Sequence, residues 1–173
     1  KNLRVLLCPP RKENISEKML RSVFGGILVQ DEDSGLDSEI TSVTKIKFPE
    51  EKKSLAHFGI MVAKHLRSNA IALVKQHKNG NFQLVGAGMG QPNRIDCIKI
   101  LAGPRAKAKS SLEELVLISD AFFPFSDAVE ISAELGIKFI VQPGGSIRDG
   151  EVIAAADRMG IAMAFTQTRH FRH

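Results

Sequence analysis

Five short apolar segments separated by helical patterns constrain the fold of this chain more than any other feature of its sequence. Each segment has the length and the apolar content of a buried strand. In chain order they read AIALVKQ, FQLVG, LVLIS, KFIVQ and AMAFT, between residues 70 and 166. The turn HKNGN joins the first two and predicts an antiparallel hairpin. Strands that alternate with helices at this spacing predict an α/β sheet with parallel neighbours.

The helices are expected between these strands and before them. The first should run from Pro49 to about Ser68, with one apolar face made by Leu55, Phe58, Val62 and Leu66. A second should follow a glycine-rich loop, with Ile95, Ile98 and Ala102 facing one way. Two more are expected from Ser126 to about Leu135 and from about Ile147 to Met159.

The amino-terminal part is expected to form an arm. LRVLLCPP predicts a short buried strand that Pro9 and Pro10 end, and GGILVQDED predicts a second strand that ends in a charged turn. The alternating segment SVTKIKF predicts an edge strand or an extended segment.

Composition excludes several classes of protein. Hydrophobic residues make up 43% and charged residues 25%, which is ordinary for a globular domain. The longest apolar runs are much shorter than the roughly 20 residues of a membrane span, so a soluble protein is expected. Lys and Arg number 24 against 19 Asp and Glu, a surplus that suits an anionic partner without requiring nucleic acid. Cys8 and Cys97 lack zinc-type spacing and are read as reduced intracellular thiols.

Three loops of unusual composition fall where α/β sheets usually bind ligands, between strand ends and helix starts. The first is GAGMGQPNR, from Gly86 to Arg94, whose three glycines would let the backbone approach a ligand. Asn93 is expected to cap the helix that Arg94 begins, and a helix start beside a guanidinium favours an anion. A plain glycine turn with a solvated arginine is the alternative.

The second loop, SDAFFPF, places three phenylalanines in one bend although the chain has no Trp and no Tyr. Pro124 interrupts a regular strand or helix, so the rings should line a turn, either as a pocket wall or as core packing. Ser126 and Asp127 suit a helix start, and the carboxylate could instead grip a flat amino-heterocycle beside the rings. Asp120 would bind a cation or hold the loop.

The third loop is QPGGSIRD, in which Ser146 and Asp149 resemble a capping box. Its glycines would also expose backbone N–H groups to an anion or to the edge of a heterocycle. The chain then ends in TRHFRH, a basic tail that is either solvated or held at the sheet end, where Arg169 would reach a phosphate. His57, His65 and His77 are expected on surfaces.

Together these motifs resemble a known family. SNAIALVK, GAGMGQPNRID, SDAFFPFSDAVE, QPGGSIRDGEVIAAAD and RHFRH are similar to the carboxy-terminal part of the bifunctional purine-biosynthesis proteins that join AICAR transformylase to IMP cyclohydrolase. The resemblance implies a cytidine-deaminase-like fold, a three-layer α/β/α arrangement with a mixed sheet that is the second subdomain of a duplicated transformylase domain. Residues 25–173 would be that subdomain, and residues 1–24 the arm or tail of the preceding one.

The resemblance also implies an activity. The family's transformylase moves a formyl group from its cosubstrate 10-formyltetrahydrofolate to AICAR, giving FAICAR in de novo purine (IMP) synthesis. It implies a cytoplasmic homodimer with shared sites, joined to a preceding transformylase subdomain and a cyclohydrolase domain, and neither nucleic acid nor a membrane as a partner.

Site residues are carried over by position. The resemblance assigns AICAR contacts to Asn69, Arg94 and Arg169, with Arg169 toward the phosphate and Arg94 offered across the dimer. It assigns folate contacts to Ile95, Phe122, Asp127, Ser146 and Ile147. A monovalent cation, potassium, would lie near Ser68, Asp120 and His173.

The chain departs from the family pattern in two respects. The family's catalytic Lys-His pair stands in a KHxNP motif, whereas KHLRS at Lys64 and His65 lacks the Asn-Pro and falls on an expected helix. The general base and the cyclohydrolase domain are therefore expected outside this chain, and Pro92, Asn93 and Ala128 also differ from the family's loops. The alternative function is a non-catalytic nucleotide-binding α/β module. An upstream Lys-His followed by Asn-Pro would favour the enzyme.

Overall fold

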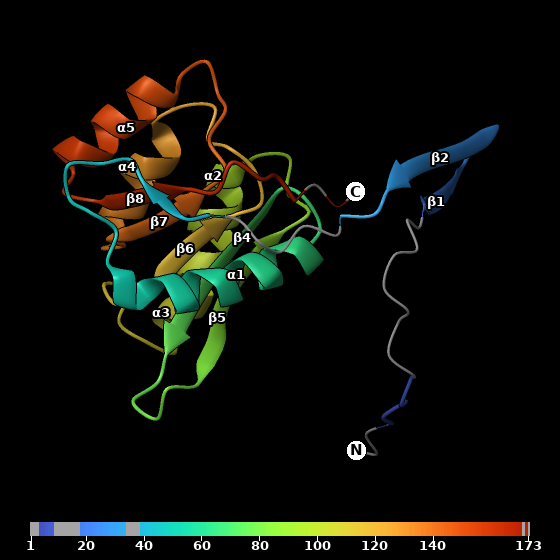
Figure 1. Cartoon of the computed structure of the whole chain (residues 1–173), viewed down its shortest axis with the longest axis horizontal. Helices are drawn as coiled ribbons and strands as arrows, with labels where there is room; N and C mark the ends of the chain where they lie inside the picture. Colours follow the sequence, from blue (N-terminus) through green and yellow to red (C-terminus); the bar gives the residue numbers. More distant parts are fainter. Residues whose placement is uncertain (1–3, 9–17, 34–38, 171, 173) are drawn as a thin grey trace. The chain divides into compact units, whose positions relative to one another are not determined.

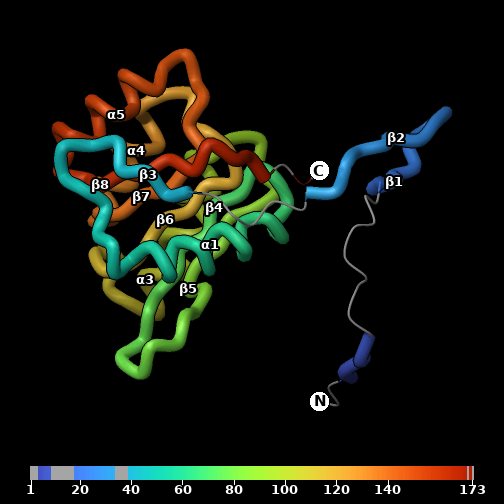
Figure 2. The backbone as a smooth tube through the Cα atoms, viewed as in Figure 1, coloured from blue at the N-terminus to red at the C-terminus, as the bar shows by residue number. Residues whose placement is uncertain are grey.

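The computed structural model describes residues 4–8, 18–33, 39–170 and 172. The chain divides into two compact units, Lys1–Ser34 and Gly35–His173, which Figures 1 and 2 colour along the sequence. The predicted boundary between residues 24 and 25 falls inside the first unit, in the turn of a hairpin.

The first unit contains an antiparallel hairpin of β1 (Lys18–Val23) and β2 (Gly26–Asp31). Gly25 has a positive φ of 77° in the turn, a conformation that glycine adopts without steric cost. Every residue of both strands is exposed. The register puts apolar side chains on both faces: Leu20, Ile27 and Val29 on one, Met19, Val23 and Leu28 on the other.

The prediction of a buried strand in LRVLLCPP is wrong for the described residues. Arg4–Cys8 have no strand structure, and Val5, Leu6 and Leu7 are 73%, 90% and 97% exposed. An apolar run becomes a buried strand only when a neighbouring strand takes its backbone hydrogen bonds. In the part of the chain that the structure describes, no strand pairs with this segment.

The second unit is built on a six-stranded mixed sheet with the order β3-β8-β7-β6-β4-β5. The strands are β3 (Thr41–Ser42), β4 (Ala70–Gln76), β5 (Phe82–Met89), β6 (Val116–Ser119), β7 (Phe139–Gln142) and β8 (Ala162–Phe165). β6, β7 and β8 are parallel, whereas β4 is antiparallel to both β5 and β6, and β3 to β8. The predicted hairpin and the α/β class with a mixed sheet are confirmed, while the edge strand β3 includes only the first residue of SVTKIKF, Ser42.

Helices cover both faces of this sheet (Figure 1). They are α1 (Lys53–His65), preceded by a 3-10 turn at Glu50–Lys52, α2 (Arg94–Asp96), a π-helical turn at Cys97–Ala102, α3 (Gly103–Lys107), α4 (Asp127–Glu134) and α5 (Asp149–Arg158). α1 packs on one face against Ala72 and Val74, and the other helices pack on the opposite face against Ile71 and Leu73. Successive side chains of a strand point to opposite faces, so β4 is apolar on both. Among the described residues, no helix combines the length and apolar character that a bilayer crossing requires.

The buried face of α1 differs from the predicted one. Leu55 is buried as expected, but Phe58, Val62 and Leu66 are only partly buried at the edge of the core. The centre of the contact is made by Ala56, Gly59, Ile60 and Ala63. A Cβ on Gly59 would lie 3.0 Å from Val74 Cγ2 and closer still to Ile118. Small residues therefore let the helix approach the sheet, and the larger ones flank them.

Candidate functional site

One edge of the six-stranded sheet collects the loops that the sequence singled out. β6, β7 and β8 run parallel and therefore end at the same edge. β4 begins there and β5 ends there, because Ile71 pairs with Ser119 and Ala70 pairs with Met89. We call this edge, with the loops 90–93, 120–126, 143–148 and 166–170, the rim. Its loops come from segments far apart in the sequence.

Arg94 is held at the rim by the end of β6. Asn93 caps α2, as predicted, and its side-chain oxygen accepts from the Asp96 N–H at 2.8 Å. Arg94 Nε donates to Ser119 Oγ, and Arg94 Nη2 donates to Asp120 Oδ1, both at 3.1 Å. The Arg94 side chain is 11% exposed and that of Asp120 is 0% exposed. The alternative of a solvated arginine is therefore wrong.

Asp120 connects four segments of the unit. Its Oδ2 accepts a hydrogen bond from Ser68 Oγ, which precedes β4. Its backbone N–H donates to Ala70 O at 3.2 Å, and its backbone carbonyl accepts from the His170 N–H at 2.9 Å. The Ser68 N–H donates to Arg172 O at 2.9 Å. The described part of the basic tail is thus held at the sheet end, one of the two alternatives left by the sequence.

The carboxylate of Asp120 already has a cationic partner within the protein. A guanidinium nitrogen lies 3.1 Å from one carboxylate oxygen, so the negative charge is already balanced by Arg94. Among the residues that the structure describes, no three His, Cys, Asp or Glu side chains gather to hold a metal ion. Ser68 and Asp120 lie together as predicted, whereas the third predicted ligand, His173, lies outside the described residues. Potassium binding with the help of His173 stays a prediction.

Asn69 and Cys97 hold the loop that precedes Arg94. Asn69 Nδ2 donates to the backbone carbonyls of Gln91 and Pro92, at 3.0 and 3.1 Å. Cys97 Sγ donates to Asn69 O at 3.1 Å. Burial raises the pKa of the Cys97 thiol to about 11, so the thiol stays protonated and remains a donor. The start of β4 and the start of α2 are therefore tied together.

The glycines of GAGMG have a different role from the predicted one. Gly86 and Gly88 lie within β5 and face the helical segment that begins at α2. A Cβ on Gly88 would lie 2.7 Å from the Cα and carbonyl carbon of Cys97, and one on Gly86 would lie 3.1 Å from the Ala102 carbonyl carbon. These glycines admit the backbone of the π-helical turn, not a ligand. Gly90, with a φ of 68°, lies in the loop.

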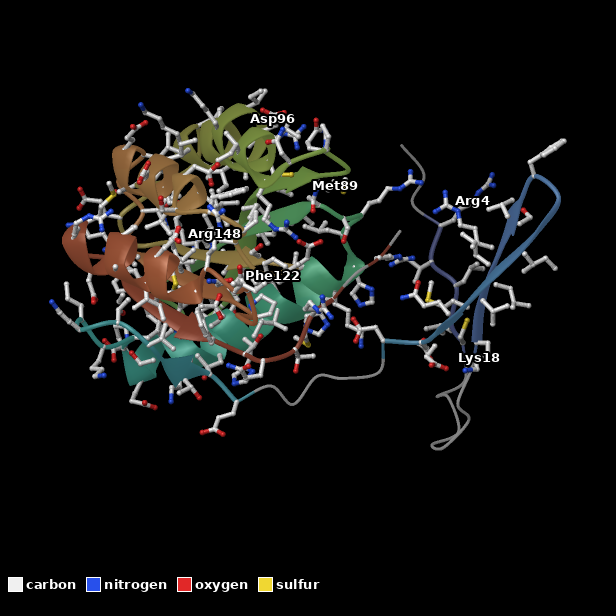
Figure 3. The ribbon with its side chains drawn as sticks, turned by 90° about the horizontal axis from the view of Figure 1, so that it is seen from above. Arg4, Lys18, Met89, Asp96, Phe122 and Arg148 are labelled. Atoms are coloured by element: carbon white, nitrogen blue, oxygen red, sulfur yellow. The ribbon has the colours of Figure 1, made fainter. Side chains whose placement is uncertain are left out.

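The three rings of the bend divide between core and surface. Phe123 is fully buried, and its backbone N–H donates to the buried Gln142 Oε1 at 3.0 Å. Phe125 is 48% exposed, and the Arg148 guanidinium lies 4.7 Å from its ring centroid. Phe122, which precedes Phe123, is half-buried. Figure 3 labels Phe122 and Arg148, from the loops that follow β6 and β7. Phe123 is core, while Phe122 and Phe125 are available as a pocket wall.

The loop after β7 forms one half of the predicted capping box, the bond from the Ser146 N–H to the Asp149 carboxylate, while the residue directly before α5 is Arg148, whose side chain makes no cap bond. Asp149 accepts from the backbone N–H groups of Gly145 at 2.7 Å and Ser146 at 3.2 Å. Ser146 Oγ in turn accepts from the Arg148 N–H at 3.1 Å. Asp149 thus satisfies two of the N–H groups that the sequence offered to a ligand. Ile147 is fully exposed beside them.

The start of α4 departs from its predicted capping. Ser126 occupies the N-cap position, but its hydroxyl donates to Glu130 Oε1 at 3.0 Å and makes no cap hydrogen bond. The exposed Asp127 accepts from the Ala128 N–H at 2.7 Å instead. The Ser126 hydroxyl thus donates its proton to a carboxylate, and its oxygen accepts no hydrogen bond from the first N–H groups of the helix.

Side-chain contacts at the rim form two clusters that contain or adjoin most of the predicted site residues. The first contains Ser68, Asn69, Arg94 and Asp120. The second is the contact between Phe125 and Arg148. Ser146 and Ile147 lie in the same loop as Arg148, whereas Phe122 lies in the loop of Phe125 and Asp127 begins α4 directly after it. Arg169 is exposed in the segment after β8, and Ile95 is half-buried against the core. The hollow of about 580 Å³ lined by residues 75–79 and Glu114 lies at the opposite end of β4.

Sequence reasoning missed three residues that organise these clusters: Ser119, Gln142 and Arg148. The first two share a signal, since each is a polar residue at the carboxyl end of an otherwise apolar, buried strand. A buried polar side chain needs partners, so such a position indicates a contact with a neighbouring loop. Arg148 gave no comparable signal.

Comparison with known proteins gives one consistent result. The family described as AICARFT/IMPCHase bienzyme matches residues 1–103. The bifunctional purine biosynthesis protein PurH of Lactobacillus delbrueckii subsp. bulgaricus is 47% identical over 177 residues, and that of Anoxybacillus flavithermus is 46% identical over 178. PurH of Leuconostoc mesenteroides is 44% identical over 176 residues. Each comparison covers 100% of this chain and 33% of the relative, so the chain spans about a third of their length.

Proposed function

This chain belongs to the AICARFT/IMPCHase bienzyme family, and we propose that it forms part of the formyltransferase site of a bifunctional purine-biosynthesis enzyme. The reaction is the transfer of a formyl group from 10-formyltetrahydrofolate to the 5-amino group of AICAR. The observation that carries the proposal is the rim, where three loops and the carboxy-terminal segment meet at one edge of the sheet. Such an edge is where open α/β sheets bind their ligands.

The first cluster is proposed to bind the nucleotide. Arg94 uses Nε and Nη2 within the protein, and among the described residues no partner is found for its Nη1. That nitrogen keeps its N–H donors for an acceptor on AICAR. Asn69 shapes the same loop through Gln91 and Pro92. Arg169, exposed after β8, is proposed to bind the phosphate, since a guanidinium and a phosphate form strong charge-assisted hydrogen bonds.

The second cluster is proposed to bind the folate. Phe122 and Phe125 offer ring surface to a flat heterocycle, and Ile147 adds an exposed apolar side chain. Asp127 is an exposed carboxylate that suits the amino groups of a pterin. Ser146 is proposed to contact the folate from the loop after β7. Ile95 is proposed to contribute from the start of α2.

Catalysis in this proposal rests on placement. The amine of AICAR is a weak nucleophile, so holding it beside the formyl carbon and removing its proton during attack would supply the rate enhancement. The rim residues hold the two substrates, and a Lys-His pair from another part of the enzyme removes the proton. Potassium stays a prediction, and no step depends on it. A cytoplasmic homodimer with shared sites, completed by the preceding subdomain and a cyclohydrolase domain, belongs to the same proposal.

A second candidate is a nucleotide-binding module without catalysis. It is favoured by one observation, which is that the Lys64-His65 pair of this chain ends α1 and lacks the following Asn-Pro. Such a module would bind AICAR without transferring a formyl group.

The test uses Arg169→Ala in the complete enzyme that contains this chain. We expect AICAR binding to weaken by about 1.5–3 kcal/mol, because a charge-assisted bond to the phosphate is lost. Isothermal titration calorimetry measures the affinity, and Arg158→Ala is the control, since Arg158 ends α5 at the sheet edge opposite the rim. Equal affinities for the Arg169 variant and the control would refute the phosphate contact. AICAR binding without formyl transfer in the unsubstituted enzyme would favour the module.

A further inference from the structure

We propose that Asp120 is a positioning residue, which fixes the guanidinium of Arg94 for AICAR and does not serve as a cation ligand. The inference rests on the proposed function and adds a mechanism for the nucleotide cluster. It concerns how one buried carboxylate prepares the side chain that meets the substrate.

The first argument is burial. The Asp120 side chain is fully buried, and a carboxylate is retained in such a place only when it is paired and hydrogen-bonded. Asp120 meets both conditions, because Oδ1 accepts from Arg94 Nη2 and Oδ2 accepts from Ser68 Oγ. Its backbone groups are bonded to Ala70 and His170. The carboxylate therefore has a single, well-defined orientation.

The second argument is the geometry of the guanidinium. Ser119 Oγ donates to Ala121 O at 2.7 Å, which leaves a lone pair on that oxygen for Arg94 Nε. Arg94 is thus held at two nitrogens by two consecutive residues, Ser119 and Asp120. Because the guanidinium is planar and rigid, two fixed nitrogens also fix the direction of Nη1. The group that AICAR would meet is oriented before the ligand arrives.

The third argument is charge. The Arg94–Asp120 pair is neutral as a unit, with 3.1 Å between Nη2 and Oδ1. A potassium ion on the same carboxylate would lie close to the guanidinium and would be repelled by it at short range in a poorly solvated site. One carboxylate cannot neutralise both cations.

The experiment is a double-mutant cycle in the complete enzyme, with AICAR affinity measured by calorimetry. Asp120→Asn keeps the size of the side chain and removes its charge, and we expect a loss of affinity of roughly tenfold because Arg94 loses its anchor. Arg94→Ala should lower AICAR affinity roughly 30-fold or more, and the double variant should bind AICAR no more weakly than Arg94→Ala alone. Glu134→Gln is the control, because it makes the same chemical change on an exposed carboxylate at the end of α4 and should leave AICAR affinity unchanged.

Thermal melting supplies a readout that does not need AICAR. Arg94→Ala leaves a buried carboxylate without its cation, so adding Asp120→Asn to that variant should raise the melting temperature. Exchanging potassium for choline should shift the melting temperature of the unsubstituted enzyme and of Asp120→Asn by the same amount. If Asp120→Asn does not fold, Ser119→Ala replaces it in the cycle. We expect Ser119→Ala to lower AICAR affinity roughly threefold, and to have no further effect on affinity when Arg94 is already alanine.

The outcomes separate the two proposals. Failure of the unsubstituted enzyme to bind AICAR would overturn the proposed function and this inference with it. Normal AICAR binding combined with additive losses in the cycle would overturn the inference alone. A potassium-specific stabilisation that Asp120→Asn abolishes would also overturn it, because Asp120 would then hold the ion.

Discussion

The sharpest test of the packing behind the rim is Gly88→Ala. Gly88 lies in β5 and faces the π-helical turn that continues from α2. A Cβ at this position would lie 2.7 Å from the Cα and carbonyl carbon of Cys97, where an ordinary contact needs at least 3.4 Å. Cys97 is fully buried and its thiol is bonded to Asn69 O, so its backbone has little freedom to move away.

The expected change in the free energy of unfolding combines one destabilising effect with two stabilising ones. Overpacking a close-packed site costs about 1–3 kcal/mol, and we expect the upper end, because the obstacle is backbone and not a flexible side chain. The added methyl group gains at most about 0.8 kcal/mol from burial. Replacing glycine also restricts the unfolded chain, which stabilises by about 0.4–1 kcal/mol when the native conformation tolerates alanine. The net prediction is a loss of about 2 kcal/mol, or a fall in melting temperature of roughly 4–8 °C.

The assay is thermal unfolding of the 173-residue chain, followed by circular dichroism. Gly150→Ala is the matched control, because Gly150 lies in α5 and a Cβ there would have no atom within 4 Å. It should raise the stability by about 0.5–1 kcal/mol through helix propensity. The same substitution is thus expected to act with opposite signs at the two positions. A Gly88→Ala chain as stable as Gly150→Ala would refute the close approach of strand and turn.

Three other predictions concern the thiols and the carboxylate of Asp149. At pH 8 an alkylating reagent should modify the exposed Cys8 and spare the buried Cys97, as peptide mass spectrometry would show; modification of both at equal rates would contradict the burial of Cys97. Because the pKa of Cys97 is raised from 9.0 to about 11, its contribution to stability should be complete below pH 9 and lost as the pH rises toward 11. Asp149→Ala should destabilise the chain by about 1–2 kcal/mol in denaturant unfolding, since two backbone N–H groups lose their acceptor. Glu151→Ala, which removes only an exposed ion pair, should change stability by less than about 0.5 kcal/mol, and equal losses for the two variants would refute the capping role.

Local patterns in the sequence predicted local structure well. The five apolar strands between residues 70 and 166 and the Asn93 cap depend on residues within a few positions of one another and are confirmed, and so is the half of the Ser146–Asp149 box in which Asp149 accepts from the Ser146 N–H. Their physical basis is periodic burial and short-range hydrogen bonding, and both can be predicted from the residue types at neighbouring positions.

Features that depend on distant partners were harder to predict. Gly86 and Gly88 look like a ligand loop in the sequence, yet their neighbour is the backbone of Cys97 and Ala102, which only the packed structure places there. The pairing of Arg94 with Asp120 requires the end of β6 to lie beside the start of α2, and residue spacing does not encode that register.

The strand prediction for Arg4–Cys8 was wrong because a strand also needs a partner segment. Its apolar residues carry the pattern of a strand, but pairing is a property of two segments, and the described residues hold no partner strand. The buried face of α1 differs from the predicted one because large side chains were expected to be the buried ones, whereas the small residues Gly59 and Ala63 are buried and Gly59 lies closest to the strands.

The β1–β2 hairpin has a practical consequence for handling this chain in the laboratory. Among the described residues, no third strand pairs with either edge of this hairpin, and aliphatic side chains lie on both of its faces, including Leu20 and Leu28 at 68% and 57% exposure. Edges of this kind pair readily with other strands, and a two-stranded ribbon has little stability of its own in water. Self-association of the purified polypeptide should therefore begin at these twelve residues and grow with protein concentration, while the sheet of the second unit stays intact.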